Sequence, residues 1–319
     1  MTLVWIIDEE WPDTEYEQAA LAAALPGAQV RVSGYDYAAD LSEFGYRADL
    51  ILAQIYTYIP AVVIERLERC RGIAVFGGGY DRVDVAAARA KGIGVTNVKG
   101  YCAPDIAEYV LTAIAWLNRP LPAWGHQGDG PWGAPALVSP PRRLSSQTLH
   151  LIGYGAIGRT VGQAARRAGL RVLATDPLVA PEVMVADGVT PATRAEGLGQ
   201  ADYVSLHVAL SPETEGLFGW TELAAMKPTA YLINTARGAL VDEAALIEAV
   251  AAGAIGGAVL DVIVHEPPEP DDPVLHQPHI LVTPHISYLT KEAFADLRAR
   301  TVANALALYR GETPADLVN

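Results

Sequence analysis

The sequence predicts an α/β protein with two domains, each built on a doubly wound parallel sheet. Short apolar runs alternate with helical stretches twice along the chain, over residues 3–96 and again from residue 149 to about residue 287. The apolar runs lack the strict alternation of a half-exposed strand, which indicates that helices cover both faces of each sheet. A chain of 319 residues is long enough to form two such domains.

In the first series, five apolar runs are predicted to be strands, and the alanine-rich stretches between them are predicted to be helices. The strands are expected at residues 3–7, 29–32, 50–53, 73–76 and 93–96. Helical patterns lie at residues 15–25, 62–69 and 85–90. Strands that alternate with helices in this way form a parallel sheet.

A long helix is predicted over residues 104–117, where apolar side chains surround Glu108. A helix that is apolar on most sides must be buried on most sides. Residues 121–141 are rich in Gly, Pro and Trp and show no periodicity, so they are predicted to form a long surface connection. Such connections usually have a function or a partner. The last predicted element is an amphipathic helix over residues 291–310.

The second series opens with a glycine-rich segment between an apolar run at 149–152 and a helical stretch at 159–168. Its residues are Gly153, Tyr154, Gly155, Ala156, Ile157 and Gly158. Glycines at this spacing permit a tight turn and let the backbone approach a pyrophosphate, and the helix N-terminus favours phosphate groups. A further apolar run, 172–174, leads to Asp176, which suits a ribose 2′-hydroxyl and repels a 2′-phosphate. The segment predicts a Rossmann-like domain that binds NAD rather than NADP.

Three later predicted strands lead to residues suited to act on a carbonyl compound. Arg237 follows the first, Asp261 and Glu266 follow the second, and His285 follows the third. In open parallel sheets, ligands bind at the carboxyl ends of the strands. Arginine presents a planar fork to a carboxylate or carbonyl oxygen, and histidine beside a carboxylate is an acid near neutral pH. These groups are the ones that reduction of a carbonyl requires.

The composition excludes several classes of partner. The net charge of −14 argues against nucleic acid and against an anionic membrane surface. Only two cysteines occur, Cys70 and Cys102, which is no disulfide framework and fits the reducing cytoplasm. No apolar stretch reaches membrane-spanning length, and the N-terminus lacks the features of a signal peptide. We therefore expect a cytoplasmic protein, and we expect no metal site.

In the order and spacing of these motifs, the chain resembles the NAD-dependent D-2-hydroxyacid dehydrogenase family over nearly its whole length. Besides the glycine segment and Asp176, the matching stretches are 204–207 with Thr214, 234–238 with 241–243, 260–262, 266–267 and 283–286. The resemblance implies NADH-dependent, reversible reduction of a small 2-keto acid to a D-2-hydroxy acid. The catalytic residues would be Arg237, Glu266 and His285, with Glu266 keeping His285 protonated near neutrality.

The resemblance also implies positions that bind cofactor and substrate. Asp261 corresponds to a contact with the nicotinamide carboxamide, and the backbone N–H groups of Gly78 and Gly79 would bind the substrate carboxylate. Tyr101 is equally consistent with a substrate contact and with packing at a hinge. His207 is equally consistent with the adenosine side of the cleft and with a structural role. The other implied cofactor positions are Thr214, Thr235, Ala236, Arg237, His285 and Ser287.

The architecture implied by the resemblance is discontinuous. Residues 1–100 and 288–319 would form a flavodoxin-like substrate domain, residues 101–287 would form the NAD-binding domain, and the reaction would occur in the cleft between them. Residues 104–141 would pair two chains into a homodimer.

Two other functions remain open. Residues 98–102 resemble those of C-terminal binding proteins, which favours an NADH-sensing regulatory protein as one alternative. Phosphoglycerate dehydrogenase is the other, although the chain stops at Asn319 and would lack a C-terminal regulatory domain. Formate dehydrogenase is disfavoured because that branch of the family carries glutamine where this chain has Glu266.

Overall fold

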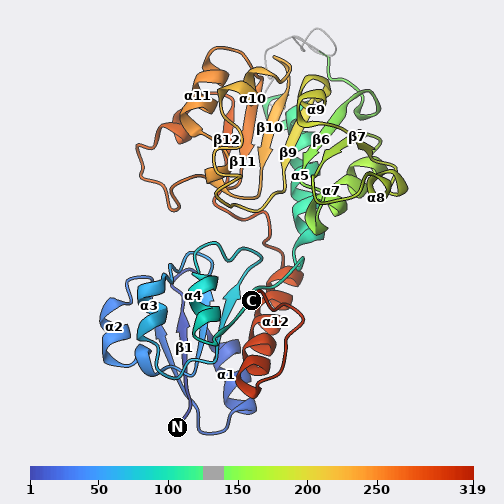
Figure 1. Ribbon diagram of the computed structural model, residues 1–319. Coiled ribbons are helices and arrows are strands. Elements are labelled where there is room, and N and C mark those ends of the chain that lie inside the picture. The colour runs from blue at the N-terminus through green and yellow to red at the C-terminus, as the bar shows by residue number, and fades with distance from the viewer. Residues whose placement is uncertain (125–139) are drawn as a thin grey trace. The chain divides into compact units, whose positions relative to one another are not determined.

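The computed structural model describes residues 1–124 and 140–319, which form two units with one parallel sheet each (Figure 1). Met1–Tyr101 and Thr290–Asn319 form the first unit, and Cys102–Leu289 form the second. The predicted α/β class with two parallel sheets is confirmed.

The sheet of the first unit has five parallel strands in the order β2-β1-β3-β4-β5. The strands are β1 (Leu3–Ile7), β2 (Gln29–Ser33), β3 (Leu50–Gln54), β4 (Gly72–Phe76) and β5 (Gly94–Thr96). The helices are α1 (Glu15–Ala24), α2 (Ala38–Glu43), α3 (Ala61–Arg66), α4 (Val85–Ala90) and α12 (Lys291–Arg310). Helix α2 lies outside the predicted helical stretches.

Alternate residues of β1, β3 and β4 pack into two cores on opposite faces of the sheet. Trp5 packs with residues of α2, α3 and α4 on one face of the sheet. Val4 and Ile6 pack on the other face with Leu21 of α1 and Leu308 of α12. Strands β1, β3 and β4 are buried on both faces, which explains why they are almost entirely apolar, whereas the edge strand β2 carries Gln29, Arg31 and Ser33.

Helix α3 ends at Arg66, three residues before its predicted end at residue 69. The Lys91 ammonium donates hydrogen bonds to the carbonyl oxygens of Ile64, Glu65 and Leu67. These carbonyls would otherwise lack partners at the helix C-terminus. The tertiary contact therefore stops the helix where the local pattern alone would continue it.

The sheet of the second unit has seven parallel strands in the order β12-β11-β10-β9-β6-β7-β8. The strands are β6 (Thr148–Ile152), β7 (Arg171–Thr175), β8 (Thr190–Pro191), β9 (Tyr203–Leu206), β10 (Tyr231–Asn234), β11 (Gly257–Leu260) and β12 (Ile280–Val282). The chain runs outward from β6 to β8 and then resumes on the other side of β6 at β9. In such sheets this reversal marks the ligand-binding edge.

Seven helices accompany this sheet in the described residues. They are α5 (Ala103–Asn118), α6 (Leu121–Trp124), α7 (Ala156–Arg167), α8 (Pro181–Ala186), α9 (Arg194–Gln200), α10 (Trp220–Ala224) and α11 (Glu243–Ala251). Side chains of α9, α10 and α11 share one core with β6, β9, β10 and β11. Helix α5 packs against α7.

The predicted helix over residues 104–117 is α5, but it is buried along one face and not on most sides. Ile106, Val110 and Ile114 are buried, whereas the Trp116 side chain is 40% exposed. Residues 121–141 were predicted to lack secondary structure, yet Leu121–Trp124 form the single turn α6, in which Trp124 N–H bonds to the Pro120 carbonyl oxygen. The rest of that connection, including Trp132, lies outside the described residues up to residue 139.

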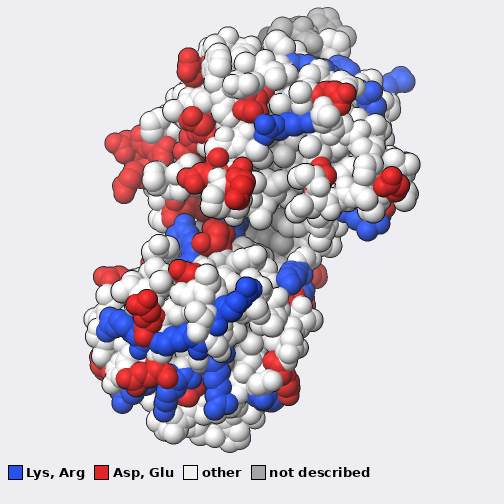
Figure 2. Space-filling view, in the orientation of Figure 1, with Lys and Arg blue, Asp and Glu red and all other residues white. Residues whose placement is uncertain are grey.

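Figure 2 shows acidic side chains gathered along one flank of the second unit, and acidic and basic side chains mixed on the first unit. The expected lack of nucleic-acid and membrane partners stays a prediction. Within residues 1–124 and 140–319, no helix is both long and apolar enough to span a bilayer.

Two glycines of α9 give a matched test of this packing. A Cβ on Gly197 would lie 2.1 Å from the ring of buried His150, whereas a Cβ on Gly199 would meet no atom within 4 Å. We expect Gly197→Ala to lower the free energy of unfolding by about 1–3 kcal/mol, because the core is overpacked. The control Gly199→Ala should raise it by about 0.5–1 kcal/mol, since alanine favours a helix. Urea denaturation measures both, and equal effects would contradict the packing described here.

Candidate functional site

The glycine-rich segment connects β6 to α7 where the strand order reverses. Gly153 has φ +95°, and a Cβ on it would lie 2.6 Å from the carbonyl oxygen of His207. A Cβ on Gly158 would lie 2.2 Å from the Gly153 carbonyl oxygen, so both positions require glycine for packing. Gly155, the N-cap residue of α7, differs because a Cβ there would meet no atom within 4 Å. This open space at a helix N-terminus fits the pyrophosphate of a dinucleotide.

Asp176, at the end of β7, folds back on the glycine-rich segment. Its Oδ2 accepts a hydrogen bond from Tyr154 N–H (2.7 Å), and its Oδ1 accepts one from Leu178 N–H (2.8 Å). Arg159, just beyond the glycines, binds the Asp187 carboxylate through Nε (2.6 Å) and Nη2 (2.9 Å). This guanidinium holds the pKa of the Asp187 carboxyl below its usual range. Arg159 is the arginine nearest in sequence to the glycine segment, and it binds Asp187 and not Asp176.

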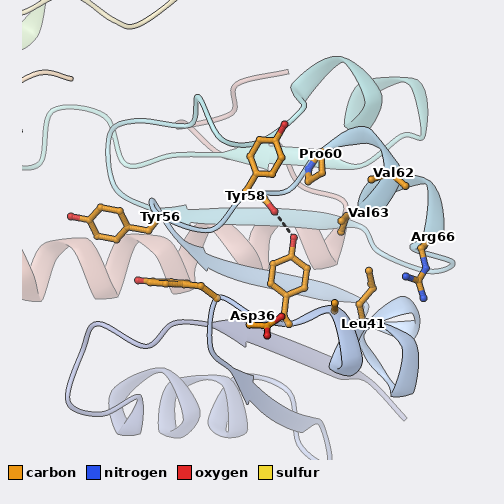
Figure 3. A pocket seen from close by; sticks show the side chains of 11 residues that line it. Asp36, Leu41, Tyr56, Tyr58, Pro60, Val62, Val63 and Arg66 are labelled. Atoms are coloured by element: carbon orange, nitrogen blue, oxygen red, sulfur yellow. Dashed lines mark hydrogen bonds between the residues drawn. The ribbon is translucent and has the colours of Figure 1, made fainter. Parts of the chain in front are cut away.

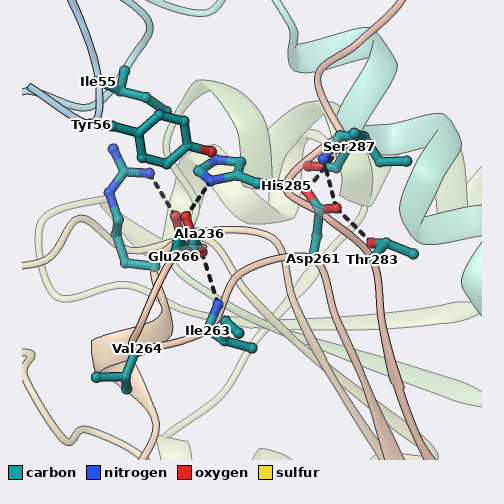
Figure 4. Close-up of polar contacts among 12 residues, drawn as sticks. Ile55, Tyr56, Ala236, Asp261, Ile263, Val264, Glu266, Thr283, His285 and Ser287 are labelled. Carbon is teal, nitrogen blue, oxygen red and sulfur yellow. Dashed lines mark hydrogen bonds and ion pairs between the residues drawn. The ribbon is translucent and has the colours of Figure 1, made fainter. Parts of the chain in front are cut away.

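The residues predicted to be catalytic follow β10, β11 and β12, whose last residues pair with one another across the sheet. His285 Nδ1 lies 2.8 Å from Glu266 Oε2, and Glu266 Oε1 accepts a hydrogen bond from Ile263 N–H at 2.9 Å (Figure 4). Arg237 follows β10 and donates through Nη1 to the Ala236 carbonyl oxygen at 2.8 Å. The structure thus joins His285 and Glu266 directly and places Arg237 at the end of the neighbouring strand.

Asp261 is buried at the end of β11 and holds the loop that carries His285. Its Oδ1 accepts hydrogen bonds from the Thr283 hydroxyl (2.6 Å) and Ile286 N–H (2.9 Å), as Figure 4 shows in part. Its Oδ2 accepts one from Ser287 N–H (2.8 Å), and its carbonyl oxygen accepts one from His285 N–H (2.9 Å). The predicted positions Asp261, His285 and Ser287 therefore belong to one hydrogen-bonded cluster.

The other predicted cofactor positions lie in loops after β9 and β10. His207 Nε2 is 3.0 Å from the Ser205 hydroxyl, and burial lowers the pKa of His207 to about 3, so the imidazole is neutral. The Thr214 hydroxyl donates to the Ala209 carbonyl oxygen at 2.7 Å and is thus engaged within its own loop. Among the described residues, the Thr235 hydroxyl is buried without a hydrogen-bond partner. A polar ligand group would remove the cost of this unsatisfied hydroxyl.

The predicted substrate loop follows β4 in the first unit. The carbonyl oxygens of Gly77 and Gly78 accept hydrogen bonds from Val98 N–H (2.8 Å) and the Asn97 side chain (2.7 Å). A Cβ on Gly78 would have its nearest neighbour 3.9 Å away, so the loop is open at this residue. An open glycine backbone allows an anion to approach N–H groups such as those of Gly78 and Gly79.

The first unit also contains a groove (Figure 3). Four tyrosines line it together with aliphatic side chains, and the Tyr37 hydroxyl donates to the Tyr58 carbonyl oxygen across it. None of the predicted substrate residues, Gly78, Gly79 and Tyr101, is among its lining residues. The two interpretations of Tyr101, substrate contact and hinge packing, both stay predictions.

Two residues of the cluster around Asp261 received no role from the sequence. Thr283 belongs to the Thr-Pro-His motif and could have been singled out there, but a threonine at a strand end has no specific meaning by itself. Tyr109 was treated as one of the apolar residues of its helix, yet its hydroxyl lies 2.5 Å from Thr283 Oγ1. No local signal relates two residues so far apart in the chain.

Comparisons with known proteins show the family to which the chain belongs. Residues 112–287 match the model of the NAD-binding domain of D-isomer specific 2-hydroxyacid dehydrogenases. A glycerate dehydrogenase of Methylorubrum extorquens is 37% identical over 79% of this chain and 80% of its own length. A glyoxylate reductase of Korarchaeum cryptofilum is 33% identical over 85% of this chain and 82% of its own.

Among solved structures, a D-lactate dehydrogenase of Aquifex aeolicus complexed with NAD and lactic acid superposes with a TM-score of 0.86 at 25% identity. That likeness covers 99% of this chain and 98% of the other. The chain accordingly belongs to the D-isomer specific 2-hydroxyacid dehydrogenases and is, as the sequence predicted, an oxidoreductase that uses NAD.

Proposed function

We propose that the chain reduces a small 2-keto acid to a D-2-hydroxy acid with NADH, in a reversible reaction. The observation that carries this proposal is the hydrogen-bonded pair of His285 and Glu266 beside Arg237, at three adjacent strand ends of an NAD-binding domain. Relatives named glycerate dehydrogenase and glyoxylate reductase favour a small substrate.

NAD would be held by the glycine-rich segment, by Asp176 and by the hydroxyl of Thr235. When bound, its reduced form supplies the hydride for the carbonyl carbon. The Asp261 carboxylate has about four acceptor positions. Residues 1–124 and 140–319 use three of them, and Oδ2 accepts one hydrogen bond from these residues. This oxygen can therefore still accept an N–H of the nicotinamide carboxamide.

The substrate would be oriented by two donor groups of different kinds. The N–H groups of Gly78 and Gly79 bind the carboxylate, and the open space around Gly78 supports such a contact. The Arg237 guanidinium presents a planar fork to the keto oxygen and the carboxylate, which polarises the carbonyl and fixes its orientation. The first unit then serves as the substrate domain, and the second unit provides the cofactor site and the acid.

His285 supplies the proton that the keto oxygen takes up as it becomes a hydroxyl. Because Nδ1 donates its hydrogen to Glu266, the proton for the substrate is the one on Nε2. Losing that proton leaves the neutral tautomer that still donates through Nδ1. Glu266 thus keeps both the ring orientation and the tautomer through the whole cycle, and the reverse reaction returns the proton to Nε2.

Turnover with a panel of 2-keto acids tests the proposal. We expect NADH oxidation with at least one of glyoxylate, hydroxypyruvate and pyruvate, and we expect His285→Gln to lower kcat/KM by about 10²–10⁴-fold, the usual contribution of a general acid. The control Glu215→Gln, in an exposed loop, should leave kcat/KM unchanged. A folded protein that binds NADH but turns over no 2-keto acid would instead favour an NADH-sensing regulatory protein.

Cofactor preference follows from the carboxylate at Asp176. We expect kcat/KM for NADH to exceed that for NADPH at least about tenfold, which is about 1.4 kcal/mol. Asp176→Asn keeps an oxygen for the Tyr154 N–H but removes the charge that repels a 2′-phosphate, so most of the preference should disappear. Glu182→Gln, an exposed charge on α8, is the control and should not alter it. Equal use of both cofactors by the unmodified protein would show that Asp176 does not face the ribose.

A homodimer built on residues 104–141 is the assembly that we propose for this cytoplasmic enzyme. Trp116 on α5 and Leu121 on α6 are 40% and 65% exposed, which gives an apolar surface beside the connection. Light scattering at micromolar concentration should give twice the chain mass of 33.9 kDa. Trp116→Glu should shift it towards the monomer, whereas Trp220→Glu, equally exposed on α10, should not. A monomeric unmodified protein would contradict this assembly.

A further inference from the structure

A chain of side-chain hydrogen bonds runs from the middle of α5 to the loop that carries His285. The Tyr109 hydroxyl lies 2.5 Å from Thr283 Oγ1, and Thr283 Oγ1 lies 2.6 Å from Asp261 Oδ1. Asp261 in turn accepts the N–H groups of Ile286 and Ser287. All of these residues belong to the second unit, and the contacts reach both sides of His285.

The direction of each hydrogen bond in this chain is determined. A threonine hydroxyl has one proton, and Thr283 donates it to the Asp261 carboxylate. The Tyr109 hydroxyl must therefore be the donor to the Thr283 oxygen. Burial raises the pKa of Tyr109 to about 12, so the phenol keeps the proton that this bond requires. Consecutive bonds of one direction polarise and strengthen one another.

The backbone at the end of this chain needs such support. His285 has φ +52°, a left-handed conformation that residues other than glycine adopt rarely. Its own N–H bonds to the Asp261 carbonyl oxygen (2.9 Å), and the next two N–H groups bond to the Asp261 carboxylate. The direction in which the imidazole leaves the backbone thus depends on where Asp261 is held.

We propose that Tyr109 is a positioning residue for proton transfer, and that it holds His285 in its productive orientation through Thr283 and Asp261. The inference rests on the proposed role of His285 as the acid. Tyr109 touches neither Glu266 nor His285 in the described contacts, so its influence passes through the hydroxyl of Thr283. The same link ties α5 to the histidine loop, two segments that are far apart in the sequence.

The test compares Tyr109→Phe with the unmodified enzyme. The phenyl ring keeps the packing of α5, so the protein should fold and still bind NADH. We expect kcat for 2-keto acid reduction to fall about fivefold, which is what an ordinary hydrogen bond is worth, with KM nearly constant. The solvent deuterium isotope effect on kcat should rise, because proton transfer becomes more limiting. Hydrogen exchange of residues 283–289 should become faster even without cofactor or substrate.

Thr283 provides conservative and disruptive variants of the same link. Thr283→Ser keeps the hydroxyl and should behave like the unmodified enzyme, whereas Thr283→Val should lower kcat at least as much as Tyr109→Phe does. The control Tyr231→Phe removes a phenol hydroxyl at the start of β10, at the end of the strand away from Arg237. It should not alter kcat, the solvent isotope effect or the hydrogen exchange of residues 283–289.

Two results would overturn the inference. One is a Tyr109→Phe enzyme with unchanged kcat, isotope effect and hydrogen exchange in residues 283–289. The other is a loss of thermal stability without any change in kcat, which would give Tyr109 a purely structural role. Failure of the proposed function is distinguishable, because the unmodified protein would then turn over no 2-keto acid, or His285→Gln would turn it over as fast as the unmodified protein. In either case, hydrogen exchange of residues 283–289 in Tyr109→Phe would still show whether Tyr109 holds the histidine loop.

Discussion

The parallel register of β10, β11 and β12 is the constraint on which the rest of the site depends. The last residues of these strands pair with one another, so the loops that follow them begin at the same edge of the sheet. Strands β10 and β11 are largely buried and β12 is the edge strand, and in such sheets ligands bind at the residues just beyond the carboxyl ends of the strands. Glu266 and His285 are hydrogen-bonded, and Arg237 follows the neighbouring strand end, because the parallel sheet brings the starts of three loops to one edge.

Asp261 holds the loop that follows β12 and carries His285. A buried carboxylate is costly unless hydrogen-bond donors surround it. Here the donors are the Thr283 hydroxyl and the N–H groups of Ile286 and Ser287, all from the segment around His285. The hydrogen bonds that stabilise the negative charge of Asp261 are therefore the same ones that hold the histidine loop in its uncommon backbone conformation.

Much of the fold and part of the site could be predicted because their signals are local. Apolar runs and turn residues placed the strands, and the spacing of Gly153, Gly155 and Gly158 indicated a dinucleotide loop. The structure shows that these glycines differ: two are required by backbone contacts, and Gly155 leaves open space. Helix boundaries were less predictable, since α3 ends where the ammonium of Lys91, from a later helix–strand connection, binds its last carbonyls.

The sequence by itself determined the α/β class, the two parallel sheets and the family, because periodicity and motif spacing are written in consecutive residues. Only the tertiary structure decided which side chains meet. Tyr109 bonds to Thr283 although 174 positions separate them, and Arg159 is held by Asp187 and not left near the glycine loop as a free cation. Such pairs arise when the sheet and helices pack, and their energies depend on distances of a few ångströms that no local pattern encodes.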